Sequence, residues 1–297
     1  MKTLENWGNN RQSQIASASA IVACLAVLTL CLLDYVHGKK QAIIASRPGL
    51  VTMKEQNTHD SSSRPLKAQS SATKDKWQQF LVALSNSNIV LIKALLKQGI
   101  NPNRSIYGQS YPLVEAVKKG SSDIVKLLLD RGAKPNIQDS LGRSPLWWAA
   151  SAGDVNSVRL LLAHGANIEA KDYNGDTPLI EAAYLGHNMV VRILLENGAN
   201  IEANHGKALI LASQNAQTPL VRFLLAHGAD IEAGTGGYTA LMAAAERGNA
   251  LTVKCLLEHG ANANIKDDSG DTPLDLAELY QYTEVVNLLK KAMARQK

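Results

Sequence analysis

Residues 175–187 read Gly-Asp-Thr-Pro-Leu-Ile-Glu-Ala-Ala-Tyr-Leu-Gly-His, and this stretch predicts one short helix with a defined start and end. Thr177 can cap the helix, and Pro178 suits the first helical position because it lacks an N–H group. Gly186 ends the helix. The apolar face is narrow and rich in small residues, which lets a second helix approach closely. It consists of Leu179, Ala182 and Ala183.

The next stretch, residues 188–203, predicts a second helix that packs against the first. Its apolar residues recur at spacings of three to four, which is the period of an amphipathic helix. They are Val190, Val191, Leu194 and Leu195. Gly198 then accepts the positive φ angle that stops the helix. The unit therefore reads turn, helix, turn, helix, turn.

The same unit recurs along the chain. The glycine that ends the second helix returns every 33 residues at Gly132, Gly165 and Gly198, and then after 30 and 32 residues at Gly228 and Gly260. A second phrase opens each unit in the same register, as in Tyr111-Pro112-Leu113, Ser144-Pro145-Leu146, Thr177-Pro178-Leu179, Thr239-Ala240-Leu241 and Thr272-Pro273-Leu274. Two features with one period predict a stack of supersecondary units.

These phrases resemble the ankyrin-repeat family, whose motif Gly-x-Thr-Pro-Leu-x-x-Ala-Ala-x-x-Gly-His is nearly met by residues 175–187. The resemblance covers residues 75–297. It implies an all-α fold, an ankyrin-repeat solenoid of stacked helix-turn-helix units with β-hairpin-like loops. We expect seven units, the first and last serving as caps: 75–104, 105–137, 138–170, 171–203, 204–233, 234–265 and 266–297.

The chain departs from the family motif in two ways. No unit keeps the histidine that follows Thr-Pro-Leu, because that position holds Val114, Trp147, Ile180, Met242 or Asp275. In the family this histidine forms hydrogen bonds within and between neighbouring hairpins, so we expect this stack to depend more on apolar contacts between units. The fifth unit also lacks three hairpin residues near His205-Gly206, so we expect one shortened loop there.

The region before the repeats predicts a membrane anchor. A polar tail, residues 1–14, precedes 19 uncharged residues, Ile15–Leu33, and a basic, flexible linker follows at residues 34–74. A helix of that length can cross a hydrocarbon core of roughly 30 Å, so we predict a single-pass transmembrane helix and a lipid bilayer as partner. The flanking Lys and Arg residues are nearly balanced and do not decide which side the repeats occupy.

The alternative is a cleaved signal segment, with the small-residue cleavage site at Val36-His37-Gly38. Cleavage there would release a secreted or periplasmic soluble protein that acts as a protective or inhibitory binding partner. The mass of the mature protein distinguishes the two readings.

Charge argues against nucleic acid as a partner. Residues 1–74 carry 9 Lys and Arg against 4 Asp and Glu, whereas residues 75–297 carry 22 of each, so the net charge of +5 belongs to the leader. Phosphate binding needs a concentrated basic face, which a neutral repeat region does not supply.

The sequence predicts no metal site, no cofactor and no enzymatic activity. His164, His227 and His259 each precede the glycine that ends a unit, and neighbouring units are roughly 8–10 Å apart, too far for two imidazoles to share one zinc ion. We expect these histidines at helix C-termini, His187 in a structural role, and Cys255 in the core. No nucleophile elbow, Walker loop or His-Glu-x-x-His motif occurs.

We therefore predict a scaffold that binds a partner protein through the concave face of the stack. By register, the candidate residues on the hairpin loops are Tyr107, Gln109, Leu141, Arg143, Tyr173, Asp176, Tyr238 and Asp268. Those on the first helices are Lys118, Lys119, Trp147, Ser151, Tyr184, Leu185, Gln214, Asn215, Glu246, Arg247, Leu279 and Tyr280. For the doublet Trp147-Trp148 we expect one ring to pack between helices and the other to approach the concave face.

Overall fold

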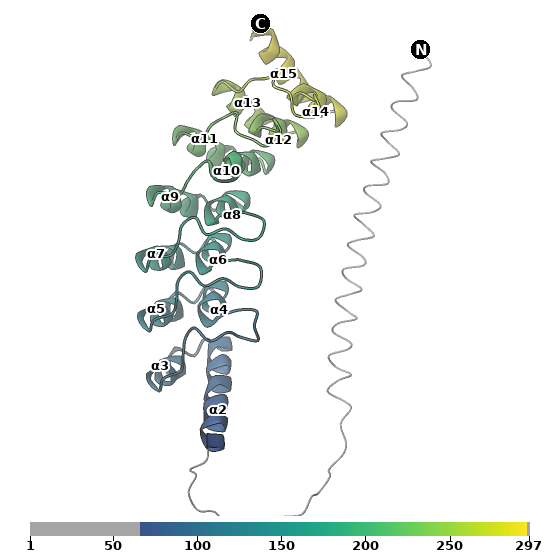
Figure 1. The fold of residues 1–297 in the computed structure, drawn as a ribbon. Helices are drawn as coiled ribbons and strands as arrows, with labels where there is room; N and C mark the ends of the chain where they lie inside the picture. Colours follow the sequence, from purple (N-terminus) through teal and green to yellow (C-terminus); the bar gives the residue numbers. More distant parts are fainter. Residues whose placement is uncertain (1–65, 296–297) are drawn as a thin grey trace, which may run out of the picture. The chain divides into compact units, whose positions relative to one another are not determined.

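The computed structural model describes residues 66–295, with side chains from residue 75 onward. These residues form helices and connecting loops without any strand, and two isolated β-bridges join Ile106 to Ser110 and Thr235 to Tyr238. The helices come in seven pairs, one for each predicted unit (Figure 1). The first pair is α2 (Leu66–Ser85) and α3 (Ile89–Lys97).

The other six pairs repeat one plan, a first helix followed by a second helix. The first helices are α4 (Pro112–Lys118), α6 (Pro145–Ser151), α8 (Pro178–Leu185), α10 (Ala203–Gln214), α12 (Ala240–Glu246) and α14 (Pro273–Leu279). The second helices are α5 (Ser122–Asp130), α7 (Val155–Ala163), α9 (Asn188–Glu196), α11 (Thr218–Ala226), α13 (Ala250–Glu258) and α15 (Thr283–Arg295).

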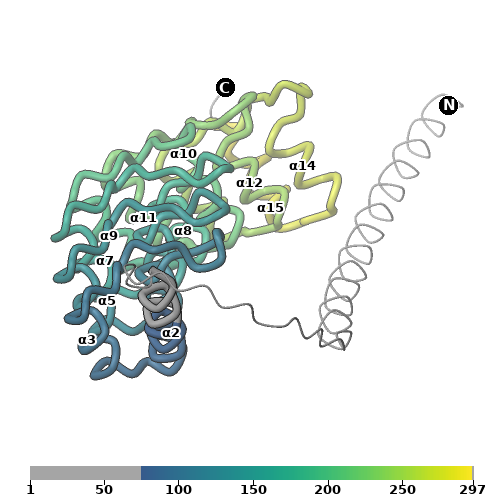
Figure 2. Tube along the Cα trace, turned by 60° about the horizontal axis from the view of Figure 1, so that its bottom comes forward, coloured from purple at the N-terminus to yellow at the C-terminus, as the bar shows by residue number. Residues whose placement is uncertain are grey.

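The units stack so that the first helices contact one another along the whole stack, as do most successive second helices. The first helices α4, α6 and α8 follow one another along one side, and the second helices α5, α7 and α9 follow along the other (Figure 1). Figure 2 shows the same two rows from another direction. We call the loop that precedes each first helix a finger. The surface formed by the fingers and the first helices is the first-helix face.

One continuous apolar core runs through the stack. The first helices bury alanines against their neighbours, among them Ala149, Ala150, Ala182, Ala183 and Ala244. Leucines and valines of the second helices, such as Val158 and Leu161, are fully buried. The small residues let helices of adjacent units approach closely, which confirms the narrow apolar face predicted from the sequence.

Helix starts and ends follow the predicted signals. Ser144, Thr177, Thr239 and Thr272 each cap a first helix by accepting a hydrogen bond from a backbone N–H three residues later. Gly198 has a φ of 87° directly after the C-cap of α9. The caps satisfy backbone groups that a short helix would otherwise leave unpaired.

Polar contacts between units are more extensive than we expected from the missing histidine. A side chain in one unit accepts a hydrogen bond from a backbone N–H of the next unit at five successive positions, namely Asn103, Asn136, Glu169, Glu202 and Glu232. The stack therefore does not depend on apolar contacts alone, because other residue positions supply the bonds between units.

The fifth unit has the shortened finger that its sequence predicts. Asn204, His205 and Gly206 all have positive φ angles, of 52°, 58° and 70°. This left-handed turn lies near the start of α10, and the regular helix of the fifth unit follows it directly. The row of fingers is therefore interrupted between the fourth and the sixth units.

The N-terminal boundary differs from the prediction. Helix α2 begins at Leu66. The flexible linker expected at residues 34–74 therefore overlaps the first turns of this helix. The predicted tail at residues 1–14 and transmembrane helix at residues 15–33 lie outside the described residues. Within residues 66–295, no helix is both long and apolar enough to span a bilayer.

Candidate functional site

The tips of the N-terminal fingers carry exposed apolar side chains. Tyr107 and Tyr173 are each 79% exposed, and Leu141 is 49% exposed. Backbone hydrogen bonds join these fingers, from Ser140 N to Gln109 O at 3.1 Å and from Tyr173 N to Leu141 O at 3.3 Å. The apolar tips are therefore presented on a connected row of loops, as predicted for a protein-binding surface.

An aspartate that the sequence reading overlooked shapes the finger of the third unit. Oδ1 of Asp139 accepts hydrogen bonds from Leu141 N at 2.9 Å and from Arg143 N at 3.0 Å, which closes the loop. Asp172 and Asp267 do the same in the fourth and seventh units. The 33-residue spacing of Asp139 and Asp172 is the signal that could have revealed this role.

The tryptophan doublet divides as expected, but the assignment of Trp147 to the binding surface is wrong. Trp147 is only 5% exposed, because the position that follows Pro-Leu faces the interior of the stack. Trp148 is the half-buried member, and its Nε1 donates a 2.8 Å hydrogen bond to Oδ2 of Asp139. The two rings meet edge to face with centroids 5.2 Å apart. Trp148 is thus the tryptophan available to the first-helix face.

Two cations surround the Trp148 ring. The guanidinium carbon of Arg143 lies 4.3 Å from the ring centroid of Trp147 and 5.1 Å from that of Trp148. Lys118 places its ammonium 4.3 Å from the centroid of Trp148 and pairs with Glu115 at 3.3 Å. Arg143 has no ion pair among the described residues, and its buried Nε has no hydrogen-bond acceptor. The stacking therefore holds a guanidinium in place without neutralising it.

The middle of the first-helix face neutralises its own charges. Nζ of Lys207 contacts both carboxylate oxygens of Asp176, at 2.6 and 2.9 Å. Ser151 donates a 2.8 Å hydrogen bond to Glu181 of the next unit. Asp176 and Ser151, both predicted to contact a partner, are therefore engaged within the stack.

Beside this neutral middle, Tyr184 and Leu185 are 46% and 42% exposed at the end of α8. Asn215, also predicted as a contact residue, donates a 2.8 Å hydrogen bond to the carbonyl of Tyr184. Gln214 is half-buried beside it. At the N-terminal end of the face, Lys119 donates a 2.6 Å hydrogen bond to the Ser85 carbonyl. Lys119 therefore caps the C-terminus of α2, as Asn215 caps that of α8.

The C-terminal end of the face is aromatic and acidic. The hydroxyl of Tyr238 donates a hydrogen bond to Glu246, while Leu279 and Tyr280 are 48% and 49% exposed. Burial raises the pKa of Tyr238 above its ordinary value of 10.0, and the hydrogen bond to Glu246 and its negative charge raise that pKa further.

Tyr282 belongs to this end although the sequence reading did not select it. Its ring stacks on that of Tyr280 with centroids 6.0 Å apart, and 36% of the residue is exposed. The acidic finger beside it includes the exposed Asp268, whose backbone N–H binds the Gly236 carbonyl at 2.8 Å. Arg247 is exposed at the end of α12.

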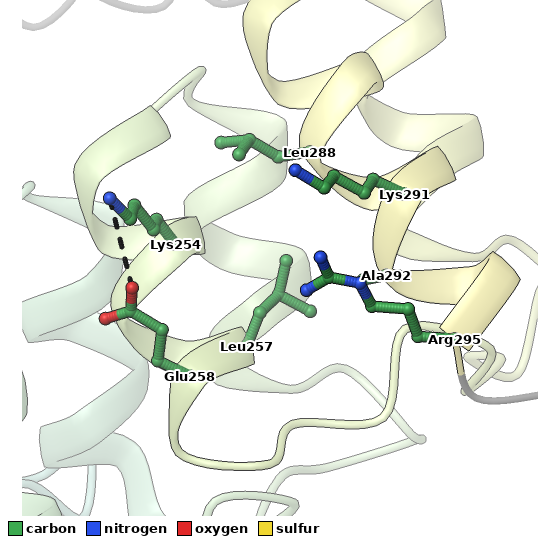
Figure 3. Close-up of a pocket in the computed structure, with 7 residues that line it drawn as sticks. All are labelled: Lys254, Leu257, Glu258, Leu288, Lys291, Ala292 and Arg295. Atoms are coloured by element: carbon green, nitrogen blue, oxygen red, sulfur yellow. Dashed lines mark ion pairs between the residues drawn. The ribbon is translucent and has the colours of Figure 1, made fainter.

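A rival pocket lies on the opposite, second-helix side of the stack. It has a volume of about 290 Å³ between α13 and α15, with Leu257, Leu288 and Ala292 as its apolar lining (Figure 3). Lys254, which pairs with Glu258 at 3.9 Å, and Lys291 and Arg295 of α15 carry the charges around it. A similar furrow lies between α5 and α7. The pocket therefore follows from stacking second helices and does not distinguish one site.

The histidines and the cysteine occupy the structural positions predicted for them. The Nδ1 atoms of His164, His227 and His259 lie 2.7–2.8 Å from carbonyl oxygens four residues earlier, at helix C-termini. His187 bridges two units through Nε2, 2.9 Å from the Ser151 carbonyl. Cys255 is 2% exposed within the core. Among residues 66–295, no His, Cys, Asp and Glu side chains gather as a metal site would require.

The fold and this exposed face define a helical repeat protein of the solenoid class. A family model described as ankyrin repeats in three copies matches residues 56–139, 113–205, 146–235 and 209–296. The chain belongs to the ankyrin-repeat family. Domains of this family generally mediate protein–protein interactions.

Individual relatives match over shorter stretches. The ankyrin repeat protein FPV031 of Fowlpox virus (strain NVSL) is 42% identical over 59 residues, which are 20% of this chain and 17% of the viral protein. Rabankyrin-5 of Mus musculus is 45% identical over 53 residues, 18% of this chain and 4% of its own length. The chain thus spans less than a fifth of either relative.

Solved structures match over more of the chain. The ankyrin repeat domain of human ASB11 superposes with a TM-score of 0.64 at 30% sequence identity, covering 71% of this chain and 95% of that domain. An ankyrin repeat domain from Acinetobacter baumannii AYE gives a TM-score of 0.56 at 31% identity, covering 61% of this chain and 97% of that domain.

Proposed function

We propose that the chain is a membrane-anchored scaffold that binds a partner protein through its first-helix face. The observation that carries the proposal is the row of exposed side chains on connected fingers and helix ends. Exposed apolar and aromatic surface comes there from Tyr107, Leu141, Tyr173, Tyr184 and Tyr280, which are between 46% and 79% exposed. Aromatic residues and arginine dominate the energetics of protein interfaces.

A capture experiment tests the binding face. The full chain carrying Tyr173→Ala, Tyr184→Ala and Arg143→Ala should lose the partner proteins that the unchanged chain retains. The matched control carries Lys93→Ala, Arg159→Ala and Glu196→Ala, three exposed residues on second helices. If the first-helix variant and the control retain the same partners, the proposed face is wrong.

The anchor is a separate part of the proposal. It is supported by the 19 uncharged residues from Ile15 to Leu33, which are enough for a helix across a bilayer. The full chain should remain with membranes after extraction at high pH, and its intact mass should include residues 1–38. A mature protein that begins near residue 39 would instead support the alternative, a secreted or periplasmic binding protein that protects or inhibits its partner.

The proposal assigns no catalytic step and no nucleic-acid ligand to the repeats. Lys and Arg balance Asp and Glu over residues 75–297, at 22 of each. Turnover in a hydrolase or transferase screen with the purified full chain would contradict the first part. Salt-sensitive binding to RNA or DNA that depends on the repeats would contradict the second.

A further inference from the structure

The two ends of the first-helix face carry opposite charge. Arg104, together with the finger and first helix of the second unit at residues 105–119, gives three basic residues against one acidic residue, Glu115. The same elements of the seventh unit, residues 266–280, hold five acidic residues against Lys266, and one of the five, Glu278, pairs with Lys290 of α15 at 2.9 Å. Between these ends, the salt bridge from Lys207 to Asp176 removes the net charge of the fourth and fifth fingers. The first-helix face therefore carries positive charge at its N-terminal end and negative charge at its C-terminal end.

Each charged end combines its charge with aromatic surface. At the basic end, Arg143 is held against Trp147 and Trp148 and has no ion pair among the described residues. A stacked guanidinium is well placed to bind a carboxylate through two hydrogen bonds. At the acidic end, Asp268 and the exposed Tyr280 ring offer a carboxylate and an aromatic face. Each of these groups suits a lysine or arginine side chain, the carboxylate through an ion pair and the ring through a cation–π contact.

We infer that the partner presents an extended segment with an acidic residue at one end and a basic residue at the other. The acidic residue binds Arg143 beside Trp148, and the basic residue binds the Asp268 and Tyr280 end. This inference rests on the proposed function, since it specifies the chemistry of the partner on the same face. Opposite charges on the two ends fix the direction in which the segment lies.

The geometry sets the length of the segment. Arg143 belongs to the third unit and Asp268 to the seventh, so four unit spacings separate them. Helices of adjacent units pack about 8–10 Å apart, which places the two ends roughly 30–40 Å from each other. An extended chain advances about 3.3 Å per residue. The acidic and basic residues of the segment should therefore be roughly 10–12 residues apart.

The shortened finger of the fifth unit fits an extended occupant. The left-handed turn at Asn204, His205 and Gly206 replaces a finger, so no loop tip stands between the fourth and the sixth fingers. Tyr184 and Leu185, exposed at the end of the neighbouring α8, supply apolar contact along the neutral middle. A segment that crosses the middle needs apolar side chains there and no charge.

A peptide-display experiment tests the inference. A library of random 16-residue peptides is selected for binding to the purified full chain. We expect the enriched peptides to place Asp or Glu near one end and Lys or Arg near the other, about 10–12 residues apart. Enriched peptides without paired opposite charges would overturn the inference while leaving protein binding intact. Failure to enrich any peptide would also overturn it, whereas the capture experiment above tests the proposed function itself.

Charge reversal then tests the direction. Arg143→Glu should weaken an enriched peptide by about 10- to 100-fold, and replacing the acidic residue of the peptide with Arg should restore binding. Arg159→Glu, on the second helix of the same unit, is the matched control and should change little. At the other end, Asp268→Lys should weaken binding, and replacing the basic residue of the peptide with Glu should restore it. Glu196→Lys is the control. Equal effects of the test and control variants, or rescue at the wrong end, would refute the inference.

Discussion

The ammonium of Lys207 lies 2.6 Å from Oδ1 of Asp176, so a salt bridge joins the first helix of the fifth unit to the finger of the fourth. The side chains are 32% and 17% exposed, which places the pair between a surface ion pair and a buried one. Asp176 also accepts a 3.3 Å hydrogen bond from Asn204 in the left-handed turn. The short finger of the fifth unit is thus tied to its neighbour by polar contacts.

Lys207→Ala should lower the free energy of unfolding by about 1–2 kcal/mol, because it leaves the half-buried Asp176 without its cation. Lys126→Ala is the control, since its partner Asp130 is 45% exposed and solvent screens this surface pair. Urea denaturation monitored by circular dichroism measures both. Equal losses would mean that the Lys207 pair contributes no more than a surface contact.

Gly206→Ala should destabilise the fold more than Gly198→Ala. Both glycines have positive φ angles, 70° and 87°, so an alanine at either costs about 1 kcal/mol. At Gly206 the added Cβ would also lie 2.5 Å from Cβ of Ala233, whereas nothing lies within 4 Å at Gly198. We expect a further loss of about 1–3 kcal/mol at Gly206 from this clash. Thermal unfolding of the two variants should differ accordingly, and equal midpoints would contradict the close approach.

The repeat architecture was predictable because its signals are periodic. The glycines at 33-residue intervals, the Thr-Pro-Leu phrases and the three-to-four spacing of apolar residues each indicate the same local structure. The short fifth finger was also visible, since three residues are missing there. Contacts between units were harder to predict, because they depend on side chains about 30 residues apart, such as Glu232 and Asn262.

The position of each residue in the repeat predicted which side chains are exposed on the candidate face, but it did not predict the contacts that they make. Exposure agrees with register for Tyr107, Tyr173 and Tyr184. Trp147 was misplaced because two adjacent tryptophans on a helix point in different directions, and only packing decides which one is buried. The bonds of Asp139 to Arg143 and Trp148 were missed because one aspartate can serve a turn or a surface equally well.

Asp139→Ala should destabilise the third unit by about 2–4 kcal/mol, because three donors lose their acceptor: Leu141 N, Arg143 N and Trp148 Nε1. Asp139→Asn should cost less, since its Oδ1 can still accept the two backbone bonds. Denaturant unfolding gives the cost. Near-ultraviolet circular dichroism reports whether the Trp148 ring keeps its orientation. If Asn and Ala are equally destabilising, the backbone bonds of Asp139 are not the main contribution.

Tyr238 should resist ionisation at pH 10, the ordinary pKa of a tyrosine. Its pKa is raised above 10.0 by burial and by Glu246, so folding favours the neutral hydroxyl. The stabilisation is complete below pH 10 and falls as the pH rises above the unfolded pKa of about 10. Phenolate absorbance near pH 10 should be nearly the same in Tyr238→Phe as in the unchanged chain. A clear loss of that absorbance in Tyr238→Phe would show that the pKa of Tyr238 is not raised.

His187 provides a test of how the units are coupled in place of the missing family histidine. Its Nε2 lies 2.9 Å from the Ser151 carbonyl, at the end of the preceding first helix. Gln217 and Asn249 hold equivalent positions in later units and donate to the carbonyls of Tyr184 and of Ser213 and Gln214. One position in the repeat therefore caps the neighbouring unit with three different side chains.

His187→Ala should cost about 1–3 kcal/mol, because it removes a partly buried hydrogen bond and leaves the Ser151 carbonyl unsatisfied. His187→Asn should recover part of this loss, since an asparagine makes the equivalent bonds at Asn249. Amide hydrogen exchange should locate the change at the junction of the third and fourth units, with the seventh unit unaffected. If the Asn variant is as unstable as the Ala variant, the ring contact with Gly153, and not the hydrogen bond, holds this junction together. In that case Gly153→Ala, whose Cβ would lie 2.7 Å from the His187 ring, should cost less stability in the His187→Ala background than in the unchanged chain.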